Sequence, residues 1–209
     1  MKYLMFLSVA LCFSTLTATA QTRLAIKGGY NHTTGRVHIN NIKQPSGWQP
    51  GVNLGIQLTA DFEPPLHFTG LLSYNGRGFT YTPLTGDIQK VETSSHYVNL
   101  APLLSYDIPT RQQQHVTLTV GPMAGLGLAG TQKVTKAGTT TTSKMTFSTS
   151  SNYGLFDLAI YSSIGYHFNK FFVEGSYYLG FVSVNNNEEL DKTNLKNRAV
   201  GISIGYYLR

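Results

Sequence analysis

A strict two-residue alternation between positions 51 and 62 constrains the fold more than any other feature of the sequence. Every even position from Val52 to Phe62 is apolar, whereas the odd positions from Gly51 to Asp61 carry only Gly, Asn, Gln, Thr or Asp. Successive side chains of a β-strand point to opposite faces, so this stretch predicts a strand with one apolar and one polar face. The solvent that meets each face then decides the class of protein.

The same alternation recurs along the chain, and no segment shows a helical period. We expect eight strands, near residues 24–31, 52–62, 68–74, 98–108, 116–128, 156–168, 171–184 and 198–209. Short connections are expected at 63–65, 109–114 and 169–170, and long polar ones at 32–50, 81–95, 130–152 and 185–196. Such alternation of connection length is typical of an all-β fold, the eight-stranded antiparallel up-and-down transmembrane β-barrel.

The N-terminus has the features of an export signal. Lys2 supplies a positive charge, an apolar run follows it, and Ala18-Thr19-Ala20 forms a small-residue cleavage site. We therefore expect a signal peptide at 1–20 and one outer-membrane barrel domain at 21–209. In a barrel of this kind the short turns lie in the periplasm and the long loops lie outside the cell.

Charge limits the partners that the exported chain can have. The sequence contains 16 Lys and Arg against 10 Asp and Glu, and loss of Lys2 leaves a net charge of +5. This excess suits outer-membrane lipid and lipopolysaccharide, and it does not indicate nucleic acid. The connection at 130–152 is a Thr, Ser and Lys tract that we expect to be solvated. Its Lys133, Lys136 and Lys144 suit either lipopolysaccharide phosphates or an anionic extracellular partner.

Two kinds of barrel share this strand pattern. A soluble lipocalin-like barrel turns its apolar residues inward around a ligand, whereas a membrane barrel turns them outward into lipid. Charges on the polar faces, such as Lys27 and Glu174, favour a polar lumen. Aromatic residues on the apolar faces also gather beside the short turns, as in the girdle of a membrane barrel. The predicted girdle comprises Phe62, Phe68, Tyr106, Tyr166, Phe168, Phe171 and Tyr206.

Charges in a narrow lumen must be paired or hydrated. Lys27 and Glu174 lie at similar heights above the short-turn end, with Asp61 close by, and Arg77 and Asp157 share a height near the other rim. We expect a lower pair, Lys27 with Glu174, and an upper pair, Arg77 with Asp157. Separate hydration of each charge is the alternative.

The interior of eight strands is only wide enough for side chains to fill. The large inward residues expected to fill it are Leu71, Leu103, Met123, Tyr161 and Tyr178. This predicts a blocked lumen, and a small-solute channel is the competing hypothesis.

Catalytic and metal-binding patterns are weak. No two of the six histidines have a recognised metal spacing, and most lie at expected strand ends or in loops, where we expect solvated or interfacial roles. His96, beside Ser94 and Ser95, is the most suggestive, but no acidic residue accompanies it in sequence. The glycines between Gly121 and Gly127 lie within a strand and are expected to relieve crowding in the lumen, because no helix follows to form a phosphate loop. We predict no catalytic residue, no cofactor and no metal.

Six stretches together resemble the PorT-like outer-membrane β-barrel family of Bacteroidota over essentially the whole exported chain. They are AIKGGYNHTTG at 25–35, YVNLAPLLSYDI at 97–108, VGPMAGLGLAG at 120–130, FDLAIYSSIGYHF at 156–168, FFVEGSYYLGF at 171–181 and NRAVGISIGYYL at 197–208. The resemblance implies fold and location rather than activity. Asn99 and Ser176 stand where the family often has an inward acidic residue and an inward Arg, and the usual C-terminal aromatic is absent.

The prediction for function is a non-enzymatic integral outer-membrane barrel with a lumen filled by side chains. We expect a monomer that acts through its extracellular loops or in envelope or secretion assembly, with an envelope or extracellular protein as partner. The alternatives are a porin-like small-solute channel and, less favoured, a lipid-modifying outer-membrane enzyme or a soluble ligand binder.

Overall fold

The computed structural model describes residues 22–84, 86–111, 114–186 and 192–208, so the predicted signal peptide at 1–20 lies outside the described residues. The described residues form ten β-strands: β1 (Thr22–Ile39), β2 (Ile42–Lys43), β3 (Ser46–Glu63), β4 (Leu66–Tyr81), β5 (Ile88–Arg111), β6 (Gln114–Lys136), β7 (Thr139–Met145), β8 (Phe156–Phe168), β9 (Phe171–Gly180) and β10 (Thr193–Tyr207). Within these ranges, no helix is long and apolar enough to cross a bilayer.

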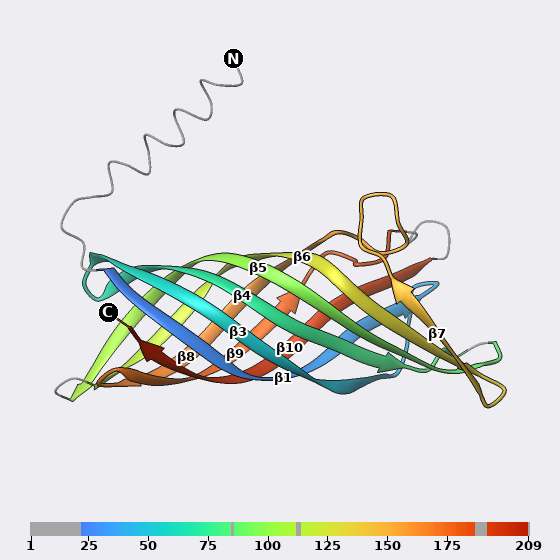
Figure 1. Ribbon diagram of the computed structural model, residues 1–209, viewed down its shortest axis with the longest axis horizontal. Coiled ribbons are helices and arrows are strands. Elements are labelled where there is room, and N and C mark those ends of the chain that lie inside the picture. Colours follow the sequence, from blue (N-terminus) through green and yellow to red (C-terminus); the bar gives the residue numbers. More distant parts are fainter. Residues whose placement is uncertain (1–21, 85, 112–113, 187–191, 209) are drawn as a thin grey trace, which may run out of the picture.

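Eight of these strands close into a ring (Figure 1). Each long strand pairs antiparallel with its neighbours in chain order, and β10 pairs with β1 over the register from Ala25–Tyr207 to Ile39–Thr193. The two remaining strands are additions, since β2 pairs with the end of β1 and β7 pairs with β6. The predicted eight-stranded antiparallel up-and-down barrel is therefore confirmed.

Most ring strands extend further toward the loop end than the sequence pattern predicts, whereas β8 matches its expected range and β9 ends at Gly180, before the expected 184. Most of the loops expected at 32–50, 81–95 and 130–152 are strand in the structure, because β1, β3, β5, β6 and β7 all extend into them. The Thr-rich tract forms the hairpin of β6 and β7, in which residues 137–138 make the turn. Thr has a high β-propensity. The hydrogen bonds between paired strands therefore stabilise this tract as a β-hairpin even though its side chains are solvated. The short turn predicted at 169–170 is confirmed, and the one predicted at 63–65 comprises residues 64–65, because Glu63 is the last residue of β3.

The apolar face of β3 points outward. Leu54 is 59% exposed and Phe62 66%, whereas Asn53 and Thr59 on the opposite face are buried. The other long strands repeat this arrangement, with Ile, Leu, Val and Phe outside. A continuous apolar exterior of this size is stable only in contact with hydrocarbon, so the outward face of each strand is the lipid face.

Inward side chains fill the barrel at two levels. The lower cluster contains Leu71, Ala101, Leu103, Met123, Ala159, Tyr161, Tyr178 and Ala199, and includes all five residues predicted to fill the lumen. The upper cluster, nearer the loop end, contains Val37, Phe79, Tyr81, Val91, Val184 and Leu195. Inward glycines make room for this filling. A Cβ on Gly125 would lie 2.6 Å from Asn99 Oδ1, and one on Gly121 would lie 3.0 Å from Leu103 Cδ2.

Candidate functional site

The lower charged group of the lumen joins β1, β8 and β9. Lys27 Nζ lies 2.6 Å from Glu174 Oε1, and Tyr161 Oη donates to the same oxygen at 2.6 Å. Lys27 Nζ also lies 3.1 Å from Tyr161 Oη, and both charged side chains are buried. Between Lys27 and Glu174, β10 presents only Gly205 and Ser203, which are small enough to let the two side chains meet.

The upper group centres on Arg77 of β4. Its Nη1 donates to Asp157 Oδ2 at 2.9 Å, and its Nη2 donates to Asn99 Oδ1 at 2.8 Å. Asn197 Nδ2 donates to the same Asp157 oxygen at 2.7 Å. The guanidinium also lies 3.8 Å from the ring centroid of Tyr178. The structure thus brings together the residues of both expected pairs. The amide oxygen of Asn99 accepts the hydrogen bond from Arg77 at the position where the PorT-like family often has an acidic residue.

Asp61 does not belong to the lower pair, near which the sequence pattern placed it. It lies 3.3 Å from Arg23 Nη2 and 2.9 Å from His67 Nδ1, at the short-turn end of the lumen. The strand register explains the difference. Lys27 is opposite Gly55 on β3, whereas Asp61 lies six residues further along that strand, beyond the partner of Arg23.

A cluster of titratable side chains fills this end of the lumen, the mouth beside the short turns. His67 bridges two carboxylates, since its Nε2 lies 2.9 Å from Asp107 Oδ2. The rings of His115 and His167 stack with centroids 4.5 Å apart. The prediction of solvated or interfacial roles is therefore wrong for His67 and His167, which are buried. Their inward parity with Asp61 and Asp107 was the signal available in the sequence. In the described part of the chain, no cluster has an arrangement that could hold a metal ion.

Little space remains inside the membrane-spanning part of the barrel. A cavity of about 30 Å³ lies between the two charged groups, lined by residues that include Lys27, Arg77, Tyr161 and Tyr178. A second, of about 10 Å³, lies among the His and Asp cluster. The larger of these has room for only a few water molecules.

The predicted aromatic girdle lies on the outer face at the short-turn end. Six of its seven residues are exposed, and Tyr206 is half-buried. Rings of the girdle touch across strands, with Phe62 and Phe68 centroids 5.3 Å apart and Phe171 and Tyr206 centroids 5.0 Å apart.

A second outward aromatic set lies toward the other end and was not predicted; two of its members, His32 and Trp48, fall where a loop was expected. His32 stacks on Trp48, with centroids 5.0 Å apart. His96 stacks on Tyr74, whose hydroxyl lies 2.7 Å from His96 Nδ1. His96 therefore faces outward beside a tyrosine, and the structure does not bring a carboxylate among the described residues to it.

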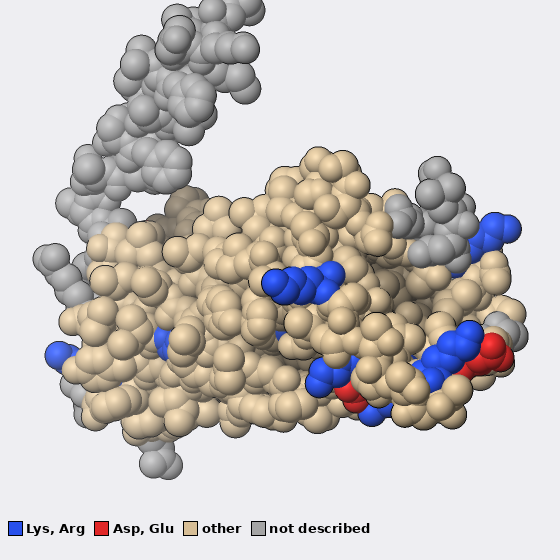
Figure 2. Space-filling model, turned by 45° about the vertical axis from the view of Figure 1, so that its right-hand side comes forward, with Lys and Arg blue, Asp and Glu red and all other residues tan. Residues whose placement is uncertain are grey.

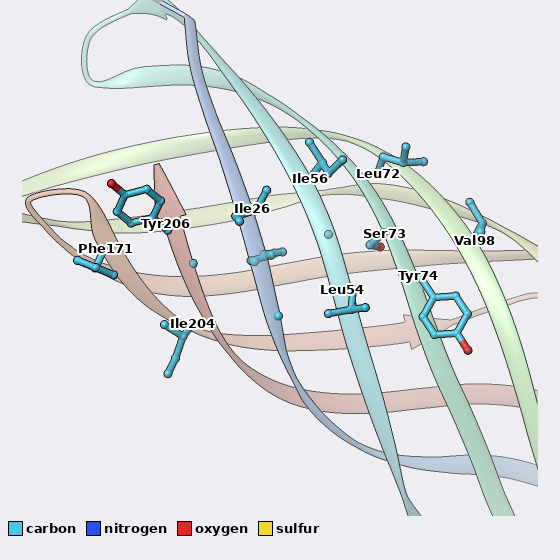
Figure 3. Close-up of a pocket in the computed structure, with 14 residues that line it drawn as sticks. Ile26, Leu54, Ile56, Leu72, Ser73, Tyr74, Val98, Phe171, Ile204 and Tyr206 are labelled. Atoms are coloured by element: carbon cyan, nitrogen blue, oxygen red, sulfur yellow. The ribbon is translucent and has the colours of Figure 1, made fainter. Parts of the chain in front are cut away.

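The lipid face is hollowed near the middle of β1 (Figure 3). Gly28 faces outward there, and the surrounding apolar side chains leave a groove of about 630 Å³. Ile26 and Leu54 flank it, and Tyr206 and Tyr74 stand toward its two sides. This groove is part of the lipid-facing surface.

The loop-bearing end carries a ribbon made of the extensions of β5, β6 and β7, which projects past the ring (Figure 1). Charged side chains gather toward this end, and much of the wall between the ends is uncharged (Figure 2). From the segment that follows β7, Phe147 reaches back to the barrel, where its ring lies 5.6 Å from that of Tyr97 and against Gly127. This contact adds an aromatic side chain at the upper end of the lumen.

Comparisons with known proteins give results at two levels. Among solved structures, the chain is similar to Neisserial surface protein A, at 11% identity and a TM-score of 0.43, covering 88% of this chain and 96% of that one. It is also similar to Ail, the attachment invasion locus protein of Yersinia pestis, at 13% identity and a TM-score of 0.43, covering 88% and 98%. No curated protein matches the chain.

The family comparison agrees with the closed strand order and the apolar exterior. Residues 19–186, which include β1 to β9, match the family described as outer membrane protein beta-barrel domain. β10 lies beyond the matched residues and completes the same ring. The chain therefore belongs to the outer-membrane β-barrel domain family.

Proposed function

We propose that this protein is a non-enzymatic, monomeric outer-membrane barrel that does not conduct solutes and acts through its extracellular end. The filled lumen is the observation that carries the proposal. The interior is occupied by the two charged groups and by the lower cluster defined above. The ring of Phe147 adds an aromatic contact at its upper end. The space between the charged groups is about 30 Å³, far too small for a hydrated solute.

Conductance in planar lipid bilayers tests this closure. The purified protein should insert without producing stable current steps, and heat-unfolded protein at the same concentration controls for leakage of the membrane. Large, stable conductance from the folded protein would contradict the filled lumen and support the small-solute channel.

The ribbon of β5, β6 and β7 supports action at the extracellular end. Its outer face carries Lys133 and Lys144 beside threonine hydroxyls, and most of β7 is exposed. A polar and cationic surface held on a ladder of paired strands suits an anionic group of an envelope or extracellular protein.

Site-specific photocrosslinking in intact cells tests this surface. A crosslinker at Thr142, on the outer face of β7, should form a protein adduct, whereas one at Thr59, buried in the lumen, should form none. Absence of any adduct from positions across the ribbon would contradict the proposed protein partner.

The surroundings of His96 support the absence of catalysis. The ring stacks on Tyr74 at the outer face, and Ser95 instead faces inward and donates to Arg77 O. Incubation with labelled phospholipid and lipopolysaccharide should give no product. Turnover that disappears in His96→Gln would overturn this assignment and support a lipid-modifying enzyme.

A further inference from the structure

Three cations gather on the outer face of β1 and β10, just above the apolar band. Arg36 lies directly opposite Lys196, and Thr34, two residues earlier on β1, lies opposite Arg198. Even positions of both strands face outward, as the exposed Tyr30 and Val200 show. Like charges placed directly opposite each other destabilise a strand pair. This arrangement therefore favours an anion that binds between them.

The Arg36 side chain reaches across β10 toward the level of Arg198. Arg36 Nη2 donates to Gly180 O at 3.1 Å, and Gly180 follows Leu179, the direct partner of Arg198. The Arg36 side chain thus crosses β10, and its guanidinium lies within one residue of the register position of Arg198. The Nε–H groups of both arginines are buried and find no acceptor among the described residues. The ion pairs of the described residues involve none of the three cations, so their charges are not neutralised within the described fold.

The height of this cluster matches a lipid headgroup. Below Arg198, the outward positions of β10 are Val200, Ile202 and Ile204, all exposed, and then Tyr206 of the girdle. The eight residues from Arg198 to Tyr206, at about 3.3 Å per residue and a tilt of about 40°, span roughly 20 Å along the membrane normal. The apolar band of such barrels is about 25 Å tall. The cations therefore lie where hydrocarbon gives way to headgroups, on the side away from the short turns.

We infer that Arg36, Lys196 and Arg198 form a binding site for a phosphate group of an outer-leaflet glycolipid, lipopolysaccharide. Arginine guanidinium groups bind phosphate with paired N–H donors, and a neighbouring lysine adds a point charge. A fixed lipid at the β1–β10 seam would hold together the two strands that close the ring. The inference requires only that the barrel spans the outer membrane, so it does not depend on the proposed extracellular partner or on the filled lumen.

Lipid binding to the full exported chain in nanodiscs tests the site. Native mass spectrometry should detect bound diphosphoryl lipid A, and Arg36→Gln/Arg198→Gln should weaken that binding about 10-fold or more, because charge-assisted bonds to phosphate are lost. The matched control is Lys43→Gln/Lys192→Gln, which removes two exposed charges at the same end of the barrel without touching the cluster. The control should bind like the unmutated protein. Heat-modifiable gel mobility confirms that each variant is folded.

Three further binding measurements test whether the site recognises the phosphate group of the lipid. Dephosphorylated lipid A should bind at least about 10-fold more weakly than the diphosphoryl form, and equal binding would overturn the site. Inorganic phosphate at millimolar concentration should not displace the lipid, and efficient displacement would show a site for free phosphate instead. Arg198→Lys should retain more binding than Arg198→Gln, and equal loss would show that Arg198 acts only structurally. Equal loss in the Lys43/Lys192 control would also overturn the proposal.

Discussion

Single side chains decide how this barrel is filled, and the Lys27–Glu174 pair is the clearest case. Both residues are buried and share Tyr161 as a third member. Parity along the strands predicts their inward position, because alternation is strict. The partnership with Tyr161, and that of Arg77 with Asn99, Asn197 and Tyr178, depends on strand tilt and register, which one strand's pattern does not contain. For the same reason Asp61 lies at a different level from the one expected.

The lower pair should show strong energetic coupling. Lys27→Met or Glu174→Gln alone should cost about 3–5 kcal/mol, because each leaves its partner buried without its counterpart. The double variant should be clearly less destabilised than the sum of the two. Urea unfolding in lipid vesicles measures this. As a control, Lys27→Met with Asp157→Asn should be additive, because Asp157 belongs to the upper group. Additivity in the Lys27–Glu174 cycle would mean that each charge is separately stabilised.

At the scale of the strand, the two faces of β3 should differ in how much an added charge destabilises the barrel. Leu54→Arg places a cation on the lipid face near mid-bilayer and should cost about 2–4 kcal/mol. Gln57→Arg, in contrast, enters the polar lumen near Asp107 and should cost less. Unfolding measurements in vesicles compare the two. An equal response would mean that the faces of β3 are assigned incorrectly.

The β6–β7 hairpin should be the site of cleavage by external protease. Lys136 is exposed beside the turn at 137–138, and Lys170 is exposed in the turn at the opposite end of the barrel. Trypsin added to intact cells should cut after Lys136 and spare Lys170, which should become accessible only after the outer membrane is permeabilised. Fragment masses identify the site. Cutting at Lys170 alone in intact cells would mean that the orientation is inverted.

The strands also show what a sequence pattern can and cannot predict. Alternation predicted all eight ring strands, because burial in lipid on one face and in the lumen on the other leaves a clear signal. It stopped short at the loop end, where polar stretches such as the Thr-rich part of β7 pair by backbone hydrogen bonds. Backbone pairing needs no apolar face, so it left no alternation to detect.

For the whole molecule, closure of the sheet predicts high resistance to detergent. The exported chain should fractionate with outer membranes and migrate faster on gels in unheated detergent than after boiling, because every ring strand is paired on both sides. Electrophoresis with and without heating checks this. Recovery of the protein as a soluble periplasmic species would contradict the membrane assignment.

The pairing of β10 with β1 also sets the order of events in biogenesis. The seam joins residues near the two ends of the chain, such as Ala25 and Tyr207, so the ring cannot close before the last strand has been exported. Until then the first and last strands each present an unpaired backbone edge that can add to another chain. We therefore expect these edges to need protection from aggregation until the barrel closes. Truncation of the last few residues should leave every upstream strand intact in sequence and still produce an aggregation-prone chain.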